Sequence, residues 1–165
     1  MKLFSVIVVG VSFAAISSAD LKSEINSMNS KIHLAMKKGD MKTCSAIMKA
    51  GVTKDFKYIE GGKTMTFDQM MEQMKASMSM MKLTKVSTSI VSLKEKGGMG
   101  TSVEKHVMEG TMTGPDKKSH TMSFSGNSTN TYRKVGKAWM LSVMSWGKNT
   151  MMMDGKPMDM SKMGG

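Results

Sequence analysis

The feature that most constrains the fold is a change of hydrophobic period near Lys82. Before it, apolar residues recur every three or four positions, and after it they alternate with polar residues, as in strands with one buried face. Turn residues divide the alternating part into four expected strands, at 83–95, 99–113, 118–134 and 137–150. Long strands joined by tight turns form an antiparallel meander. The C-terminal half is therefore predicted to be one antiparallel sheet.

The N-terminal half carries helical patterns with one short strand between them. Helices are expected over 21–38, 40–51 and 66–82, and Thr53 to Ile59 alternates as a strand does. Because helices and long strands occupy separate halves, the predicted fold class is α+β. In such a domain the three helices cover one face of a curved antiparallel sheet.

Methionine is unusually frequent, at 24 of 165 residues, whereas leucine occurs only six times. Methionine can fill an apolar core because its side chain is flexible and polarizable. The expected helices place these methionines on their apolar stripes: Met28, Met36, Met41, Met48, Met70, Met71, Met74, Met78 and Met81. Cys44, the only cysteine, lies on a similar stripe, so we expect a buried thiol and no internal disulfide.

The N-terminus has the pattern of an export signal. Lys2 precedes an apolar run from Leu3 to Ile16, and the small residues 17–19 offer a cleavage site near Ala19. The run is shorter than the ~20 apolar residues that a membrane-spanning helix needs. We therefore expect residues 1–19 to be a signal peptide. The mature protein would be periplasmic or secreted, without a stable membrane anchor.

The last fifteen residues, 151–165, have no helical period and leave two alternatives open. Part of this tail could continue the last strand and bury alternate methionines. Otherwise its exposed thioethers could bind a soft ion such as Cu(I) or Ag(I), or be sacrificial oxidation sites. The metal ligands under that alternative would be Met151, Met152, Met153, Met158, Met160 and Met163.

Charge and motifs exclude several classes of function. The formal charge is +11, nearly all from lysine, and Arg133 is the only arginine. Nucleic-acid readers depend on arginine for bidentate base contacts, so nucleic acid is not an expected partner. The three histidines are scattered without the spacing of a zinc site. The sequence also has no glycine-rich phosphate loop and no nucleophile elbow, and we expect no cofactor.

Three segments carry a resemblance to a known family. The paired opening helices meet at Lys38-Gly39-Asp40, the segment Thr53–Lys63 is a strand turning through glycine, and Tyr132–Trp139 is a hairpin leading into a strand with an early tryptophan. Over residues 20–150 this order resembles the nuclear transport factor 2-like superfamily, and within it the SnoaL-like domains of exported bacterial proteins. The resemblance implies a cone-shaped α+β domain with a pocket between helices and sheet, often in homodimers.

The resemblance does not imply a reaction, because relatives include enzymes, binding domains and assembly domains, and a fold does not fix a function. Enzymatic members place an aspartate, or a histidine and an aspartate, in the pocket as general base. Asp55 matches a commonly acidic strand position, but strand alternation points it away from the side of Phe56 and Tyr58. No catalytic residue is therefore assigned, and enzymatic activity is left open. The expected ligand is a small molecule.

The faces of the sheet follow from the strand registers. If the turns set simple registers, His106 lies opposite Ser125, and Ser125 lies opposite Trp146. Under this pairing the helix-covered face carries Val103, Val107, Met122, Phe124, Tyr132, Trp139, Leu141 and Val143. Glu104, His106 and Trp146 are then expected on the outer face. The polar or amphipathic residues predicted to line the pocket are Tyr58, Lys105, Glu109, Tyr132 and Trp139.

Overall fold

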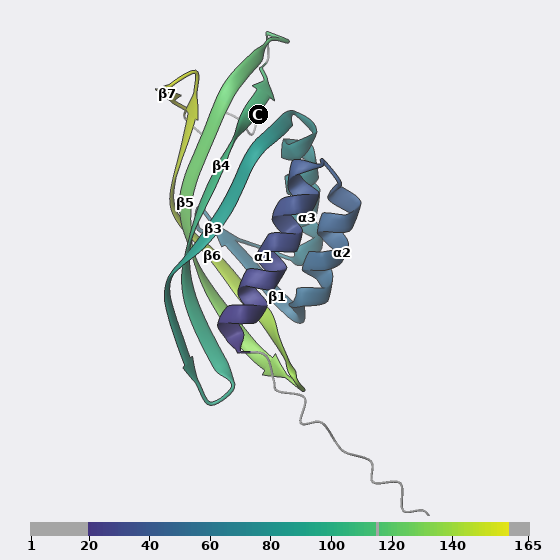
Figure 1. Ribbon diagram of the computed structural model, residues 1–165, viewed down its shortest axis with the longest axis vertical. Helices are drawn as coiled ribbons and strands as arrows, with labels where there is room; N and C mark the ends of the chain where they lie inside the picture. The colour runs from purple at the N-terminus through teal and green to yellow at the C-terminus, as the bar shows by residue number, and fades with distance from the viewer. Residues whose placement is uncertain (1–19, 115, 159–165) are drawn as a thin grey trace, which may run out of the picture.

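Three helices cover one face of a long, curved sheet (Figure 1). The computed structural model describes residues 20–114 and 116–158. The helices are α1 (Leu21–Lys37), α2 (Met41–Gly51) and α3 (Phe67–Ser79). Each begins after a side chain that accepts a hydrogen bond from a backbone N–H of the first turn, namely Asp20, Asp40 and Thr66. Such caps satisfy N–H groups that a helix leaves unpaired at its start.

The sheet contains seven strands, of which the four longest form the predicted meander. The strands are β1 (Val52–Glu60), β2 (Lys63–Met65), β3 (Met81–Lys96), β4 (Met99–Thr113), β5 (Ser119–Val135), β6 (Ala138–Met153) and β7 (Lys156–Pro157). Their order is β2-β1-β6-β5-β4-β3, with β7 paired to β6. β3 to β6 pair antiparallel, whereas β1 joins β6 in parallel. The predicted α+β fold class is confirmed.

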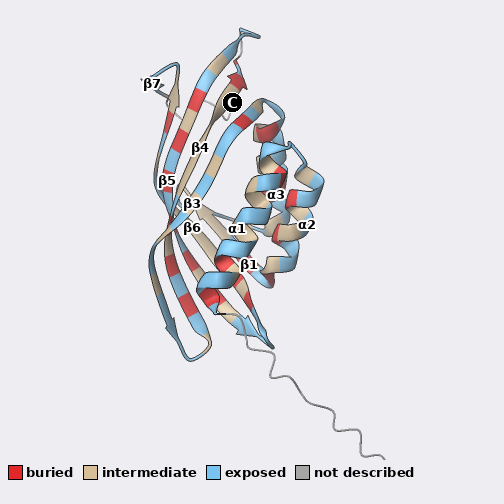
Figure 2. Cartoon of the chain, in the orientation of Figure 1, coloured by how far each residue is buried: buried red, intermediate tan, exposed pale blue. Residues whose placement is uncertain are grey.

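The core lies between the helices and the covered face of the sheet. Buried and exposed positions alternate along the long strands (Figure 2). The nine methionines assigned to helical stripes are all buried or half-buried, which confirms them as core residues. Met80, which lies off the stripe, is 45% exposed. None of the helices in the described part of the chain is long and apolar enough to span a membrane.

The predicted β4–β5 register is wrong by one residue, which reverses the faces of β4, and the predicted partner of Trp146 is wrong by three residues. His106 pairs with Gly126, and Ser128 pairs with Trp146. A one-residue shift turns every side chain of a strand to the opposite face. Glu104 and His106 therefore face the helices, and Lys105 faces outward.

A bulge in β6 explains why Trp146 also faces inward. Tyr132 pairs with Leu141, but the next pair along the ladder is Thr131 with Val143, so Ser142 has no partner. The Ser142 hydroxyl donates to the Thr131 carbonyl at 3.0 Å, and the side chain is 2% exposed. An extra residue in one strand changes which face the following side chains occupy. Trp139 and Leu141 face inward as predicted, and Trp146 faces inward because of the bulge.

The C-terminal segment is structured further than the predicted boundary at residue 150. β6 continues through Met153, and a turn at Asp154–Gly155 leads into β7. Met151 is 3% exposed. Over residues 151–153 the structure shows the continued strand, with Met151 buried. The predicted signal peptide, residues 1–19, lies outside the described residues.

Candidate ligand-binding cavity

The space between helices and sheet holds a cavity with two lobes, of about 190 and about 140 Å³. Both lobes touch α1, α3, β1, β4 and β6, so every layer of the fold contributes side chains. Six residues line both: Met36, Tyr58, Met70, Met74, Met108 and Trp146. The lobes therefore adjoin, and we treat them as one candidate site.

Thioethers make up most of the apolar lining. The methionines that contact one lobe or both are Met36, Met48, Met70, Met74, Met78, Met81, Met108, Met122, Met144 and Met151. Methionine is unbranched and polarizable, so such a wall can adjust to occupants of different shape. Ten of the 24 methionines therefore line this cavity, and others pack in the core around it.

The smaller lobe has a polar end made by two histidines and a threonine. His33 Nε2 lies 2.9 Å from Thr88 Oγ1, and the same oxygen lies 3.1 Å from His106 Nδ1. His106 Nε2 then lies 2.8 Å from Ser128 Oγ. Burial lowers the pKa of both histidines, and Lys37 lowers that of His33 further. The Thr88 hydroxyl has one hydrogen to donate, so this chain is satisfied with both imidazoles neutral.

A buried carboxylate lies two residues before His106 on the same face of β4. Glu104 is 2% exposed and accepts three hydrogen bonds. The donors are Ser102 Oγ at 2.6 Å, Tyr132 OH at 2.9 Å and Asn29 Nδ2 at 3.2 Å. Burial and the neighbouring carboxylate raise the pKa of Tyr132, so the phenol stays protonated as a donor. Glu104 thus joins α1, β4 and β5 behind Asn29, which lines the smaller lobe.

The larger lobe combines aromatic rings with a second carboxylate. Tyr58, Phe124 and Trp146 line it together with Glu60. Glu60 accepts hydrogen bonds from Tyr58 OH at 2.9 Å and from Asn149 Nδ2 at 3.2 Å. Phe124 meets the Trp146 ring edge-on, with centroids 5.6 Å apart. The indole Nε1 of Trp146 is buried beside the Tyr58 hydroxyl, without the geometry of a good hydrogen bond.

The structure brings only one of the five predicted pocket residues into this cavity. Tyr58 lines both lobes. Tyr132 and Trp139 are buried, but they line a separate depression beside α1 and α2. Lys105 is exposed, and Glu109 pairs with Lys85 Nζ at 2.7 Å, so the structure places neither residue in this cavity. The reversed face of β4 is the reason in both cases.

The residues that sequence analysis missed are Glu60, Glu104, His106 and Trp146. Strand alternation from Tyr58 to Glu60 would have indicated Glu60, because residues two apart share a face. The other three depend on the one-residue register shift and on the bulge at Ser142. No local pattern in the sequence indicates either feature.

The methionines proposed as soft-metal ligands have different positions. Met151 lies in the core, and Met153 and Met158 pack against it. Met160 and Met163 lie outside the described residues, so metal binding by that end of the chain stays a prediction. Within residues 20–114 and 116–158, no group of three or more His, Cys, Asp or Glu side chains is arranged to hold a metal ion. Burial raises the pKa of the Cys44 thiol, which keeps it protonated.

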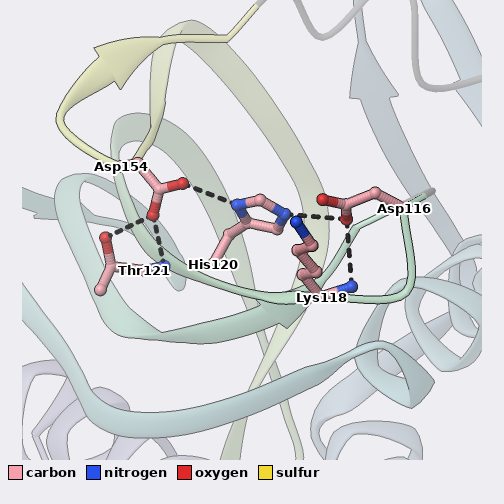
Figure 3. A network of polar contacts seen from close by, with 5 residues as sticks. All are labelled: Asp116, Lys118, His120, Thr121 and Asp154. Carbon is pink, nitrogen blue, oxygen red and sulfur yellow. Dashed lines mark hydrogen bonds and ion pairs between the residues drawn. The ribbon is translucent and has the colours of Figure 1, made fainter.

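A second polar cluster lies away from the cavity, where the β4–β5 loop meets the turn after β6 (Figure 3). His120 Nδ1 lies 2.6 Å from Asp154 Oδ2, and His120 Nε2 lies 2.9 Å from Asp116 Oδ1. Asp154 Oδ1 also accepts from the backbone N–H of Thr121 at 2.9 Å. Hydrogen bonds to the two carboxylates raise the pKa of His120, because only an imidazolium can donate from both nitrogens.

We expect this cluster to stabilise the fold in a limited pH window. The contribution of His120 to the free energy of unfolding is full below its ordinary pKa of 6.5. It is lost as the pH rises through the raised pKa of the folded state. The pKa values of Asp116 and Asp154 are lowered, chiefly by hydrogen bonds from His120. Their contribution is full above their ordinary pKa of 3.8 and is lost as the pH falls through the lowered values.

Urea unfolding should show a larger difference in the free energy of unfolding between wild type and His120→Gln near pH 5.5 than near pH 8.5. Equal differences would contradict a raised pKa.

Comparisons with known proteins identify the fold. No protein-family model matches this sequence, and no curated protein matches it either. Among solved structures, a conserved protein from Planctomyces limnophilus is similar with a TM-score of 0.60 and 11% identity, over 75% of this chain and 92% of that chain. A nuclear transport factor 2-like protein of unknown function from Shewanella oneidensis has a TM-score of 0.55 and 14% identity, over 77% of this chain and 98% of that chain.

A third similar structure comes from Rhodospirillum rubrum and is described as a nuclear transport factor 2-like protein of unknown function in nutrient uptake. Its TM-score is 0.52 and its identity 20%, over 74% of this chain and 96% of that chain. Identities this low establish an architecture and carry no activity from one protein to another. From its helices, its curved sheet and these similarities, the chain adopts the nuclear transport factor 2-like fold.

Proposed function

We propose that this protein binds a small, largely apolar molecule in the cavity between helices and sheet. The observation that carries the proposal is the cavity itself, whose two lobes of about 190 and about 140 Å³ are lined mainly by apolar side chains with a few polar groups. The thioethers would surround the apolar part of the ligand. The proposal assigns binding and no reaction.

The polar groups of the smaller lobe support the same proposal. Asn29, His33, Thr88 and His106 converge on one end of a space that is otherwise apolar. Ligand sites commonly combine an apolar lining with a few placed polar groups that fix the orientation of the ligand. We therefore propose that the ligand lies with a polar end toward His106 and an apolar body among the methionines.

The methionines allow a direct test by NMR, with protein labelled at the methionine methyl carbons. Binding of a fragment in the cavity should shift the methyl signals of Met74 and Met108 and leave those of the exposed Met80 and Met99 in place. A fragment library in which no compound shifts the cavity signals selectively would contradict the proposal.

A pair of variants links binding to the cavity. Met74→Trp should fill both lobes, because Met74 lines each of them, and it should abolish the shifts caused by any fragment. Met80→Trp is the matched control, since it introduces the same side chain at a position 45% exposed. Fragments that bind Met74→Trp as well as they bind Met80→Trp would place the site elsewhere.

We also propose that the mature protein is exported and works as a homodimer. Support for export comes from the leader pattern in residues 1–19. Support for pairing comes from the family resemblance. Mass spectrometry of the mature chain should find an N-terminus near Asp20, and sedimentation should find twice the mass of one chain. A chain that starts at Met1, or a monomer at micromolar concentration, would contradict the respective part.

A further inference from the structure

The larger lobe presents electron-rich groups from several sides. Tyr58, Phe124 and Trp146 contribute aromatic rings, and Glu60 contributes a carboxylate. The pKa of Tyr58 is raised by burial and by Glu60, so the phenol stays neutral and donates its proton to that carboxylate. Aromatic faces attract cations through the ring quadrupole, most strongly where water is excluded.

The charges around the cavity have the opposite sign to the chain as a whole. The chain carries 24 lysines and arginines and a formal charge of +11. Among the described residues that line the two lobes, none is a lysine or an arginine. His33 and His106 have pKa values lowered by burial and add no positive charge near neutral pH. An anion in the cavity would therefore meet Glu60 without a compensating charge, and a cation would be neutralised by it.

We propose that the ligand is a small organic cation with an alkylated ammonium group, held between the rings and Glu60. This inference rests on the proposed function and names the chemical class of its ligand. An alkylated ammonium is weakly hydrated and needs few hydrogen bonds, so thioethers and ring faces suit its surface.

Three probes of one shape separate charge from fit. Choline carries a trimethylammonium group. Its carbon isostere, 3,3-dimethyl-1-butanol, carries an uncharged tert-butyl group, and 3,3-dimethylbutanoate is an anion of similar shape. Calorimetric titration at pH 7.5 should give the tightest binding for choline, about tenfold tighter than its isostere, and no binding for the anion. The methionine methyl signals of Met74 and Met108 report whether each probe lies in the cavity.

Two charge variants test the role of the carboxylate. Glu60→Gln keeps a side-chain oxygen to accept from Tyr58 and removes the charge, so the preference for choline over its isostere should fall severalfold. Glu109→Gln makes the same change on the outer face, where Glu109 pairs with Lys85, and should leave the preference unchanged. If Glu60→Gln does not fold, Phe124→Leu tests the ring contribution and should also reduce the preference.

The outcomes separate this inference from the function on which it rests. Equal binding of choline and its isostere, or tighter binding of 3,3-dimethylbutanoate, overturns the inference that the ligand is a cation. The proposal of a small-molecule site would then still stand. If choline does not bind while other fragments shift the cavity methionine signals, the cation inference also fails and the small-molecule site stands. If neither choline nor any fragment shifts those signals, both proposals fail.

Discussion

Replacing Glu104 with alanine is expected to lower the free energy of unfolding by roughly 3–5 kcal/mol. The substitution removes the acceptor of three hydrogen bonds at a site only 2% exposed. Tyr132 is itself 2% exposed, so water cannot readily take the place of the carboxylate. Each buried donor that loses its acceptor costs about 1–3 kcal/mol. Equilibrium unfolding in urea, monitored by tryptophan fluorescence, measures the change.

Two further variants define the cause of that loss. Glu104→Gln keeps one oxygen as an acceptor and should cost about half as much, because part of the network survives. Glu109→Ala removes a carboxylate from an exposed ion pair with Lys85 and should cost less than about 1 kcal/mol. If Glu104→Ala were no more harmful than Glu109→Ala, the buried network would not stabilise the fold as argued.

Replacing Gly110 with alanine is expected to lower the free energy of unfolding by roughly 3 kcal/mol. Gly110 pairs with Leu83 where the β3–β4 register shifts, beside the extra residue Thr84. A methyl group at Gly110 would collide with the backbone carbonyl of Lys82 and lie 2.9 Å from Leu83 Cα. Backbone atoms cannot rotate away as a side chain can, so the strands must separate locally. Thermal or urea unfolding measures the loss.

Gly147 provides the control for this prediction. It also lies in a long strand, but a methyl group there would come no closer than 3.4 Å to another atom, the Asn127 carbonyl oxygen. Gly147→Ala should be neutral or slightly stabilising, because alanine reduces the freedom of the unfolded chain. Equal losses for the two variants would show that the collision at Gly110 is relieved without cost.

Much of the fold could be predicted because local patterns determine it. The third helix has a stripe of methionines at helical spacing, and the structure places a helix over Phe67–Ser79 with three of them buried. The four long strands alternate and end at turns that hold glycines with positive φ, such as Gly97 and Gly136. In contrast, the parallel pairing of β1 with β6 joins residues far apart in the sequence, and no local pattern specifies it.

The candidate site was harder to predict because it depends on register. Alternation shows that two faces exist, but not which face of one strand matches which face of the next. The observed β4–β5 register differs from the predicted one by one residue, so His106 rather than Lys105 faces the cavity. The bulge at Ser142 turns Trp146 to the same face. The predicted pocket therefore included Tyr58 but missed Glu60, His106 and Trp146, which supply most of the polar and aromatic groups.

The thioether lining has a thermodynamic consequence for binding. A methionine side chain that becomes fixed loses conformational entropy worth about 1.5–2 kcal/mol. A ligand that orders several of the ten lining methionines would lose much of its contact energy to this term, so its binding should be enthalpy-driven and of moderate affinity. Flexible walls also conform to many shapes at similar cost. A cavity built this way favours a range of related compounds over tight selection of one.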